Sequence, residues 1–350
     1  MKFPTPVPDP ASSRLRISTV LIAAGSSLLF CSKGVFAKCA YRHGADWLTV
    51  LALRMAFALP FFLVTGFLAA RRRPIPLTRR QWAAMAGLGF LGYYLSSVLN
   101  FAGLARISVG LERIVLYTYP SIVVLGSAVF LKTRLRLPVL AACLAAYAGI
   151  VVAFAGEAGV RSGDHGELLL GTALVFGSAL TYAAFILLSG EFLRSIGAGV
   201  FTSGVVGFSG LFVLLHAACM RPLAPLLHQR AEVYGFGAIL AVFGTVLPSY
   251  LMGIGLQRAG AARFAIIGTT GPLMTVLLAW LILGEKVNAL QAAGFILSMA
   301  GGLAVSLLKE PAEGSKTPAA SGASSRTAAR TEAESSIPSH QESAPPHFHR

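Results

Sequence analysis

Apolar and polar positions alternate in long blocks along this chain. Predominantly apolar stretches of about 20 residues, the length that a helix needs to cross the hydrocarbon core of a membrane, are separated by short polar or charged segments. The pattern therefore predicts an all-α integral membrane protein with ten transmembrane helices. We place them at residues 17–40, 46–70, 82–103, 108–131, 138–156, 168–188, 198–219, 233–256, 262–283 and 288–307.

The two halves of the chain carry related stretches. Residues 103–154 match residues 255–306 when they are shifted forward by 152 positions without a gap, and Thr118-x-Pro120 then falls on Thr270-x-Pro272. A shared register of this kind indicates an internal duplication. Ten helices divide into two units of five, and because five is odd the second unit enters the membrane from the opposite side. The sequence thus predicts two inverted five-helix repeats.

The segments outside the apolar stretches complete the expected organisation. Residues 1–16 form a polar, proline-rich arm, 17–156 the first repeat, 168–307 the second, and 308–350 a polar tail without apolar periodicity. The composition of the tail is typical of disorder. With the amino terminus inside, fourteen Lys and Arg residues fall in inside segments and seven in outside ones. Because Lys and Arg concentrate in cytoplasmic loops, we expect both termini to be cytoplasmic.

Composition supports the membrane interpretation. The chain is 55% hydrophobic and 12% charged, with a mean hydropathy of +0.70, which leaves too few charges to cover a soluble protein. The net charge of +15 would suggest nucleic acid in a soluble protein, but clusters such as 71–73 lie between apolar stretches, where they act as topology signals. The expected partners are a small-molecule substrate and the lipid bilayer, with no nucleic acid and no cofactor.

Two prolines mark the expected binding cavity. Pro120 and Pro272 lie near the middle of predicted helices, where each removes a backbone hydrogen bond and frees a carbonyl group. In lipid such groups are tolerated only inside protein or beside a water-lined cavity. The alternative is a pair of packing kinks, with Thr hydroxyls bonding to their own helices. The candidate substrate-binding residues are Lys33, Tyr117, Thr118, Tyr119, Pro120, Thr269, Thr270 and Pro272.

Charged residues within the apolar stretches are the second group of candidates. An ammonium at the centre of a membrane helix costs about 2.5 to 3.5 kcal/mol, so Lys33 should face the interior, to hold an anionic substrate or a carboxylate, unless it reaches the interface instead. Buried carboxylates can carry a coupled proton. For Arg54 and Glu285 a position at the membrane interface is the alternative. The candidate coupling or gating residues are Arg54, Glu112, Arg113 and Glu285.

Small residues recur at every fourth position in the last helix of each repeat. Such stripes let helix backbones approach closely. They could join the two repeats or form a homodimer, and the sequence leaves both open. The stripes are Ala141, Ala145, Gly149 and Ala153 in the first repeat, and Gly294, Ser298, Gly302 and Ser306 in the second.

Residues 103–152 and 255–307 resemble the two halves of an EamA-type member of the drug/metabolite transporter superfamily. The pattern is a mid-helix Pro, an apolar run ending in Gly-Glu, a Gln a few residues later and a Gly-rich last helix. The first copy has Lys132-Thr133 in place of Gly-Glu and Val139 in place of Gln, so no role of the Glu transfers to it. The second copy has Pro272, Gly284, Glu285, Gln291, Gly294 and Gly301.

The resemblance implies a carrier of the bacterial inner membrane with a central cavity. Members move small metabolites such as amino acids or their derivatives, often outward. The expected function is secondary transport by alternating access, without enzyme activity. A non-transporting receptor or assembly subunit is one alternative. An intramembrane lipid-modifying enzyme is another, although His43, His165, His216 and His228 lack acidic partners at metal-ligand spacing.

Overall fold

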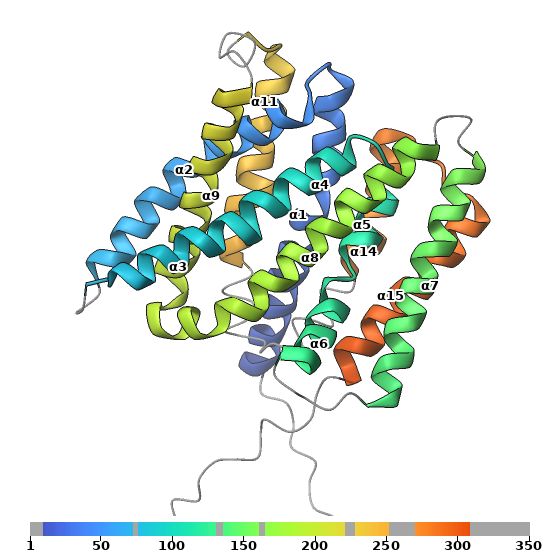
Figure 1. Cartoon of the computed structure of the whole chain (residues 1–350), viewed down its shortest axis with the longest axis horizontal. Coiled ribbons are helices and arrows are strands. Elements are labelled where there is room, and N and C mark those ends of the chain that lie inside the picture. Colours follow the sequence, from blue (N-terminus) through green and yellow to red (C-terminus); the bar gives the residue numbers. More distant parts are fainter. Residues whose placement is uncertain are drawn as a thin grey trace, which may run out of the picture. The chain divides into compact units, whose positions relative to one another are not determined.

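A computed structural model describes residues 10–72, 76–130, 136–160, 165–220, 228–251 and 270–308. Every regular element in these ranges is helical, as predicted, and the segments labelled η are π-helical (Figure 1). The elements are α1 (Pro10–Arg42), α2 (Trp47–Arg71), α3 (Arg79–Gly89), η1 (Phe90–Leu95), α4 (Ser96–Leu104), α5 (Val109–Leu116), α6 (Tyr119–Phe130), α7 (Leu137–Val160), α8 (His165–Ile196), α9 (Ala198–Met220), α11 (Ala231–Ala241), η2 (Val242–Val246), α14 (Thr270–Leu278), η3 (Ala279–Leu283) and α15 (Ala289–Leu308).

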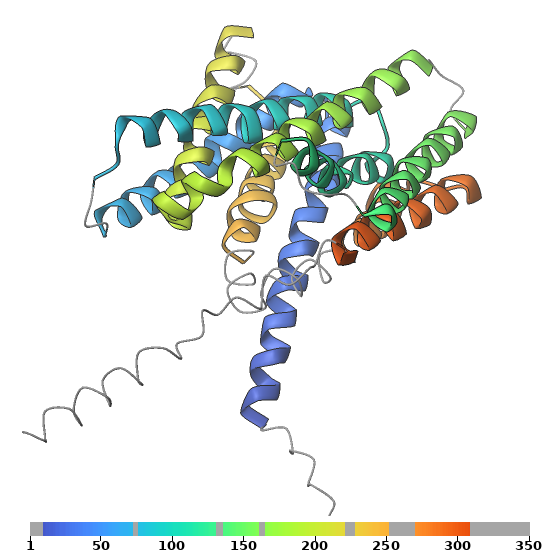
Figure 2. The same ribbon diagram turned by 60° about the horizontal axis from the view of Figure 1, so that its bottom comes forward.

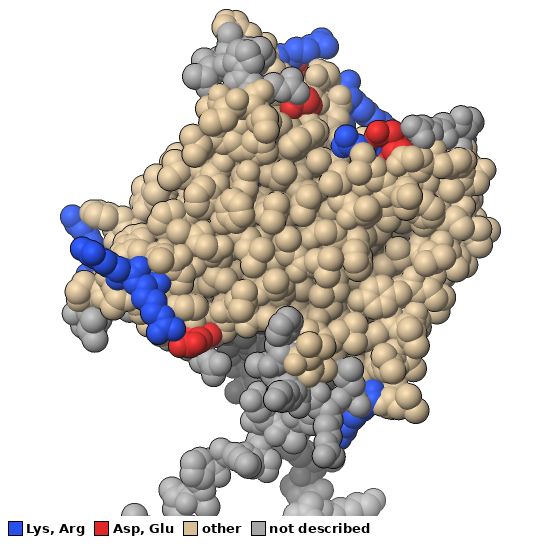
Figure 3. Space-filling view, in the orientation of Figure 1, with Lys and Arg blue, Asp and Glu red and all other residues tan. Residues whose placement is uncertain are grey.

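Several of these helices have the length and composition of membrane spans. Within the described ranges, 7 helical runs are long and apolar enough to cross a membrane, and Met274–Leu283 and Ala289–Val305 are shorter apolar runs. α1 has 33 residues and begins at Pro10, earlier than the expected start near residue 17. Figure 3 shows a broad uncharged surface with charged side chains at its margins, as a lipid-facing belt requires. The multi-pass membrane prediction is confirmed.

The predicted helix 108–131 is broken in two. α5 ends at Leu116 and α6 begins at Tyr119, so Pro120 lies in the first turn of a new helix, where a missing N–H is tolerated. Pro272 lies in α14, whose described part begins at Thr270, so a break before this proline would lie outside the described residues. Thr269 lies outside the described residues. Pro120 is therefore at the start of a helix rather than in its middle.

Two π-helical segments occupy equivalent places in the two halves. Phe90, at the start of η1, and Val242, at the start of η2, are separated by the same 152 positions that relate the repeats. A π-helical turn disturbs the regular pattern of backbone hydrogen bonds and is often found at functional sites. In η2 the Thr245 hydroxyl donates to the backbone carbonyl of Leu240 at 3.1 Å, which gives this carbonyl a side-chain hydrogen bond. The duplication thus extends beyond the stretch that first revealed it.

α7 and α15 pack against each other in antiparallel directions and lie side by side in both views (Figures 1 and 2). A Cβ atom on Gly149 would lie 2.4 Å from the Ser298 nitrogen, and one on Gly301 would lie 2.5 Å from the Ala146 nitrogen. Adding 152 to Gly149 and Ala146 gives Gly301 and Ser298. The shift that relates the repeats therefore converts one contact into the other, as in a twofold-symmetric interface. The two halves are thus joined within one chain by residues of the two stripes, Gly149, Ala153, Gly294 and Ser298.

Polar contacts on other helices repeat the same exchange. The Ser26 hydroxyl donates to the carbonyl of Pro248 at 3.1 Å, and the hydroxyls of Ser96 and Ser178 are 2.9 Å apart. Residues 26 and 178, like 96 and 248, are 152 positions apart. α2 and α9 also pack antiparallel, with Gly66 beside Ser203. The reciprocity therefore extends over several pairs of helices.

Some segments between helices are predicted to lie on the same, outer side of the membrane. In the structure, residues of these segments contact one another at one end of the helices. Arg42, at the end of α1, donates through Nη2 to the carbonyl of Leu283 at 2.5 Å. Arg106 pairs with Glu167 at 2.9 Å, between the end of α4 and the start of α8. The grouping is the one expected if consecutive connections alternate between two sides.

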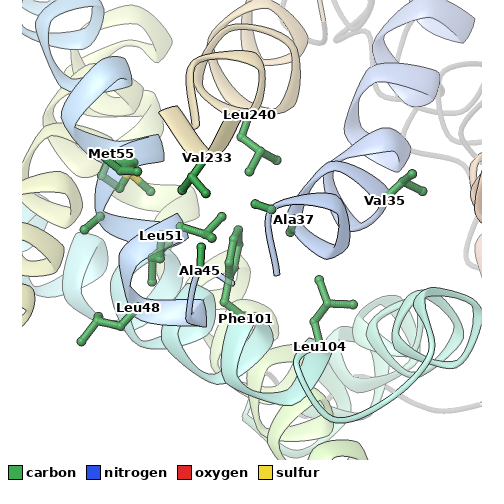
Figure 4. Packing of buried hydrophobic residues seen from close by; sticks show 14 of the residues in the cluster. Val35, Ala37, Ala45, Leu48, Leu51, Met55, Phe101, Leu104, Val233 and Leu240 are labelled. Carbon is green, nitrogen blue, oxygen red and sulfur yellow. The ribbon is translucent and has the colours of Figure 1, made fainter. Parts of the chain in front are cut away.

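Phe101 of α4 lies at the centre of the largest apolar cluster. Figure 4 shows its ring between Ala37 of α1, Leu51 of α2 and Val233 of α11. The ring is 0% exposed. Burying an aromatic side chain of this size is worth roughly 1.5 to 3 kcal/mol, so Phe101 fixes the relative positions of the helices that carry the charged residues described next.

Candidate functional site

Charged side chains from three helices meet in the interior of the helical bundle. Lys33 belongs to α1, Arg54 to α2, and Glu112 and Arg113 to α5. Glu112 is 0% exposed and Arg54 is 5% exposed. Lys33 lies within electrostatic range of the other three. We call these four residues the charged cluster. The alternative that Arg54 lies at the membrane interface is wrong, because Phe101 and neighbouring helices bury it.

Asn100 links Lys33 to Glu112. The Lys33 ammonium donates to Asn100 Oδ1 at 3.0 Å, and Asn100 Nδ2 donates to Glu112 Oε1 at 2.6 Å. The helix brings Glu112 close to α1, since a Cβ atom on Gly34 would lie 3.5 Å from Glu112 Oε2. An ammonium and a carboxylate are thus joined through an amide, while Oε2 of Glu112 has no hydrogen-bond partner in the part of the chain that the structure describes.

Arg54 joins the cluster to η2. Its Nε donates to the Thr245 hydroxyl at 2.8 Å, and its guanidinium lies 5.3 Å from the centre of the Phe101 ring. Lys33 Nζ lies 5.7 Å from the centre of the same ring. Cations over an aromatic face are stabilised by its electrons. Nη1 of Arg54 is buried and has no hydrogen-bond partner within the described ranges.

Arg113 binds the backbone of α1. Its Nη2 donates to the carbonyls of Phe30 and Cys31 at 3.1 and 3.4 Å. Nε of Arg113 lies 4.0 Å from Oε2 of Glu112. The separate partners of Glu112 and Arg113 agree with their helical spacing, because neighbouring residues point about 100° apart.

Aromatic rings continue from the cluster. Tyr119 and Tyr182 have ring centres 5.2 Å apart, and Tyr93 and Phe185 have ring centres 5.3 Å apart, both pairs in edge-to-face geometry. Tyr93 also meets Tyr182 at 6.5 Å. We call Tyr93, Tyr119, Tyr182 and Phe185 the aromatic wall. Arg54 lies within electrostatic range of Tyr93, and Arg113 of Tyr119, so the wall and the cluster adjoin.

The remaining candidates from the sequence are placed differently. Tyr117 meets Tyr119 at 6.4 Å and lies against Gly302 of α15. The buried hydroxyl of Thr118 donates to the carbonyl of Val115 at 2.7 Å, which is the packing alternative rather than cavity lining. Pro120 is partly exposed and Pro272 is buried, and the backbone of Thr270 begins α14. The structure places Pro120 at a helix break rather than in the charged cluster.

Two carboxylates bind the amino-terminal end of α5. Glu157, near the end of α7, accepts hydrogen bonds from the backbone N–H and the hydroxyl of Ser108. Glu285 accepts from the N–H of Val109 at 3.1 Å. Gly284 has a φ of 66°, a left-handed conformation that favours glycine and turns Glu285 toward α5. The Gly-Glu pair of the sequence motif therefore caps a helix of the other half of the chain.

A cleft of about 270 Å³ opens beside this cap. Its lining includes both carboxylates together with Lys38, Lys286 and Gln291. Asn288 ties the cleft to α7 by donating to the carbonyl of Gly156 at 2.7 Å. Two lysines and two carboxylates thus surround the point where α5, α7 and the start of α15 meet.

Burial raises the pKa of Glu285, which lies between η3 and α15, above its ordinary value of 4.5. The backbone N–H groups of Val109 and Gly110 and the ammonium of Lys38 act in the opposite direction, and Glu157 adds to the increase. Because the pKa of Glu285 is raised in the folded state, protonation of this carboxylate favours the folded protein. This contribution to stability is complete below about pH 4 and is lost as the pH rises through the folded-state pKa.

Replacing Glu285 by Gln should therefore make the folded protein more stable than the wild type at pH 7. The amide keeps an acceptor for Val109 but is never charged. The difference should shrink as the pH falls and vanish near pH 4. Thermal unfolding of both proteins across this pH range in one detergent measures it. A destabilisation at pH 7 would contradict the prediction, and Glu167→Gln, on a side chain that is 54% exposed, is the control.

Sequence reasoning missed several residues that complete these sites. Asn100 was only one of several polar groups in predicted helices, and Ser108, Glu157 and Thr245 were not singled out. Glu157 had a signal, because it follows Gly156 directly after the fifth predicted helix, as Glu285 follows Gly284 after the ninth. The role of Thr245 depends on a π-helical turn that no residue pattern announced.

Comparison with known proteins adds family information. The model of the EamA-like transporter family matches residues 17–155 and 169–307. The chain is 30% identical over 286 residues to the uncharacterized transporter YcbK of Bacillus subtilis, covering 79% of this chain and 88% of that protein. It is 27% identical to the uncharacterized transporter sll1319 of Synechocystis, covering 62% of this chain and 64% of that protein.

A solved crystal structure shares the fold. It aligns with a TM-score of 0.57 at 22% sequence identity and covers 83% of this chain and 98% of its own. The two family matches begin 152 positions apart, which is the register of the reciprocal contacts. Two repeats, several membrane-spanning helices and relatives named as transporters identify a membrane transporter. The chain belongs to the EamA-like transporter family.

Proposed function

We propose that this protein is a secondary carrier with ten transmembrane helices in two inverted repeats. It moves a small metabolite by alternating access around a central site formed by the charged cluster and the aromatic wall. The substrate class is an amino acid or a derivative of one, and the direction is export. No cofactor or nucleic acid takes part.

The reciprocal antiparallel contacts are the observation that carries this mechanism. The contact of Gly149 with Ser298 in one half corresponds to the contact of Gly301 with Ala146 in the other. Because the two helices are antiparallel, the twofold axis that relates these contacts is perpendicular to the helices. An axis of this kind in the membrane plane lets two similar halves form outward-open and inward-open states of comparable energy. The cap of α5 by Glu157 and Glu285 then closes one end of the pathway.

The proposed location is the bacterial inner membrane with both termini in the cytoplasm. Single cysteines at Arg72 and Arg194, in a variant lacking the four native cysteines, test the arrangement in cells. Both should be protected from an impermeant thiol reagent, whereas a cysteine at the exposed Arg230 should react. Labelling of Arg72 and Arg194 from opposite sides would exclude the inverted arrangement.

Transport itself is tested by comparing metabolites inside and outside cells that lack or overproduce the protein. A metabolite that accumulates inside the deletion strain and outside the overproducer should cross proteoliposomes containing the purified protein with saturable kinetics. Lys33→Ala should abolish this flux because it removes a cation from the proposed site. Absence of protein-dependent flux for every such metabolite would refute the carrier.

A further inference from the structure

The charged cluster comes from one repeat alone. If the halves were chemically equivalent, the residues 152 positions later would also be charged. The equivalence is spatial too, because a Cβ atom on Gly244 would lie 3.6 Å from Lys33 and one on Gly92, 152 positions earlier, would meet Phe185. Lys33, Arg54, Glu112 and Arg113 correspond to Phe185, Val206, Phe264 and Ala265. The sequence of one half therefore has charged residues where that of the other has apolar ones, and the structure describes two of these apolar counterparts, Phe185 and Val206.

The sign of the charged half is positive. It contains three cations and one carboxylate among its described residues. Glu112 is already engaged with Lys33 through Asn100, which leaves the guanidinium groups in excess. Among the described residues, buried Nη1 of Arg54 has no hydrogen-bond partner, nor has Nε of Arg113, which lies 4.0 Å from Glu112 Oε2. Buried cations are stabilised mainly by an opposite charge, so this half is incomplete without an anion.

The charged cluster adjoins the aromatic wall at the arginines, and the wall continues into the other half through Tyr182 and Phe185. Arg54 is near Tyr93 and Arg113 is near Tyr119, so a group held by either guanidinium lies beside the aromatic wall. Flat rings in edge-to-face contact offer an apolar surface with hydroxyl groups at its margin. A ligand that satisfied both surfaces would have an anionic group at one end and an apolar body at the other.

We infer that the solute carried by this protein is an amphipathic organic anion. Its carboxylate or similar group binds Arg54 and Lys33, and its apolar body lies on the aromatic wall. The inference rests on the proposed function, since it assigns the substrate of the same central site. A planar guanidinium suits a carboxylate because it can donate two parallel hydrogen bonds.

Three probes with one aromatic ring and different charge test the inference. Phenylacetate is the anion, 2-phenylethylamine the cation and 2-phenylethanol the neutral compound. Purified full-length protein is titrated with each by calorimetry, and its unfolding temperature is followed in parallel. Phenylacetate should bind saturably and raise the unfolding temperature, while the other two should not. Stronger binding of the amine, equal binding of acid and alcohol, or no binding of the acid would overturn the inference.

Variants locate the binding site. Arg54→Gln should weaken phenylacetate binding by roughly tenfold or more, as expected for the loss of a charge-assisted hydrogen bond. Arg54→Lys keeps the charge and should weaken it less. Arg230→Gln, where the side chain is 70% exposed, is the matched control and should bind like the wild type. Unchanged binding by a folded Arg54→Gln protein would overturn the assignment.

Failure of this inference differs from failure of the proposed function. Saturable flux of amines or neutral metabolites in proteoliposomes, without binding of phenylacetate, would keep the carrier and exclude the anion. Binding of phenylacetate with no protein-dependent flux of any metabolite would keep the anion site and exclude the carrier.

Discussion

Replacing Gly149 by Ala should lower the free energy of unfolding by about 1 to 3 kcal/mol, the usual cost of an overpacked core. The added Cβ atom would lie 2.4 Å from the backbone nitrogen of Ser298, which cannot move without shifting α15. Gly301→Ala should have a similar effect, because its Cβ atom would lie 2.5 Å from the Ala146 nitrogen. Thermal unfolding in detergent, with size-exclusion profiles, measures both.

Gly159→Ala is the matched control in the same helix. No neighbouring atom lies within 4 Å of the position that its Cβ atom would take. Alanine is favoured over glycine in a helix by about 1 kcal/mol, so this variant should be neutral or slightly more stable. A strong effect at Gly149 with none at Gly301 would contradict the reciprocal packing of α7 and α15.

The sequence predicted the helical architecture well because the signal is local and strong. Long apolar blocks indicate membrane helices whatever the neighbours are, and the register of 152 positions makes Gly149 and Gly301 equivalent, as their reciprocal contacts with α15 and α7 show. Pro120 predicted a disturbed helix over 108–131, but the prediction treated the proline as lying within one helix. The structure starts a new helix there, since the first turn tolerates a residue without an N–H group.

The site was only partly predictable because its contacts join residues far apart in sequence. Lys33 and Glu112 were candidates, yet Asn100, 67 positions from Lys33, was needed to see that they belong to one network. Periodicity cannot tell which face of α1 meets α4. Glu285 was recognised by its motif, but its partner on α5 and the second carboxylate, Glu157, follow from tertiary packing alone.

Neutralising a carboxylate that caps α5 should change the stability of the protein differently from neutralising the carboxylate of the charged cluster. Glu285 and Glu157 accept hydrogen bonds from backbone groups at a helix terminus, next to an open cleft. Glu112 is enclosed and faces side-chain cations. Neutralising Glu285 removes a desolvated charge, whereas neutralising Glu112 leaves buried cations without their counter-ion. Opposite signs of the stability change are therefore expected at the two positions.

Glu112→Gln should destabilise the protein by about 3 to 5 kcal/mol, the cost of removing one partner from a buried ionic group, and should abolish transport. Glutamine can still accept from Asn100, but it leaves Lys33, Arg54 and Arg113 with no negative charge nearby. Unfolding in detergent and flux in proteoliposomes measure the two effects. Glu167→Gln, which removes an exposed carboxylate 2.9 Å from Arg106, is the control and should cost no more than about 1 kcal/mol.

The double variant Lys33→Gln/Glu112→Gln separates a network effect from two local ones. If Asn100 joins the two charges, removing both should cost less than the sum of the single changes, because the second substitution no longer leaves an unpaired ion. A coupling of about 0.5 kcal/mol or more between the positions supports this. Additive losses, or a Glu112→Gln protein as stable and active as the wild type, would mean that the buried carboxylate does not balance the cations, and that the interior charge is held by other groups.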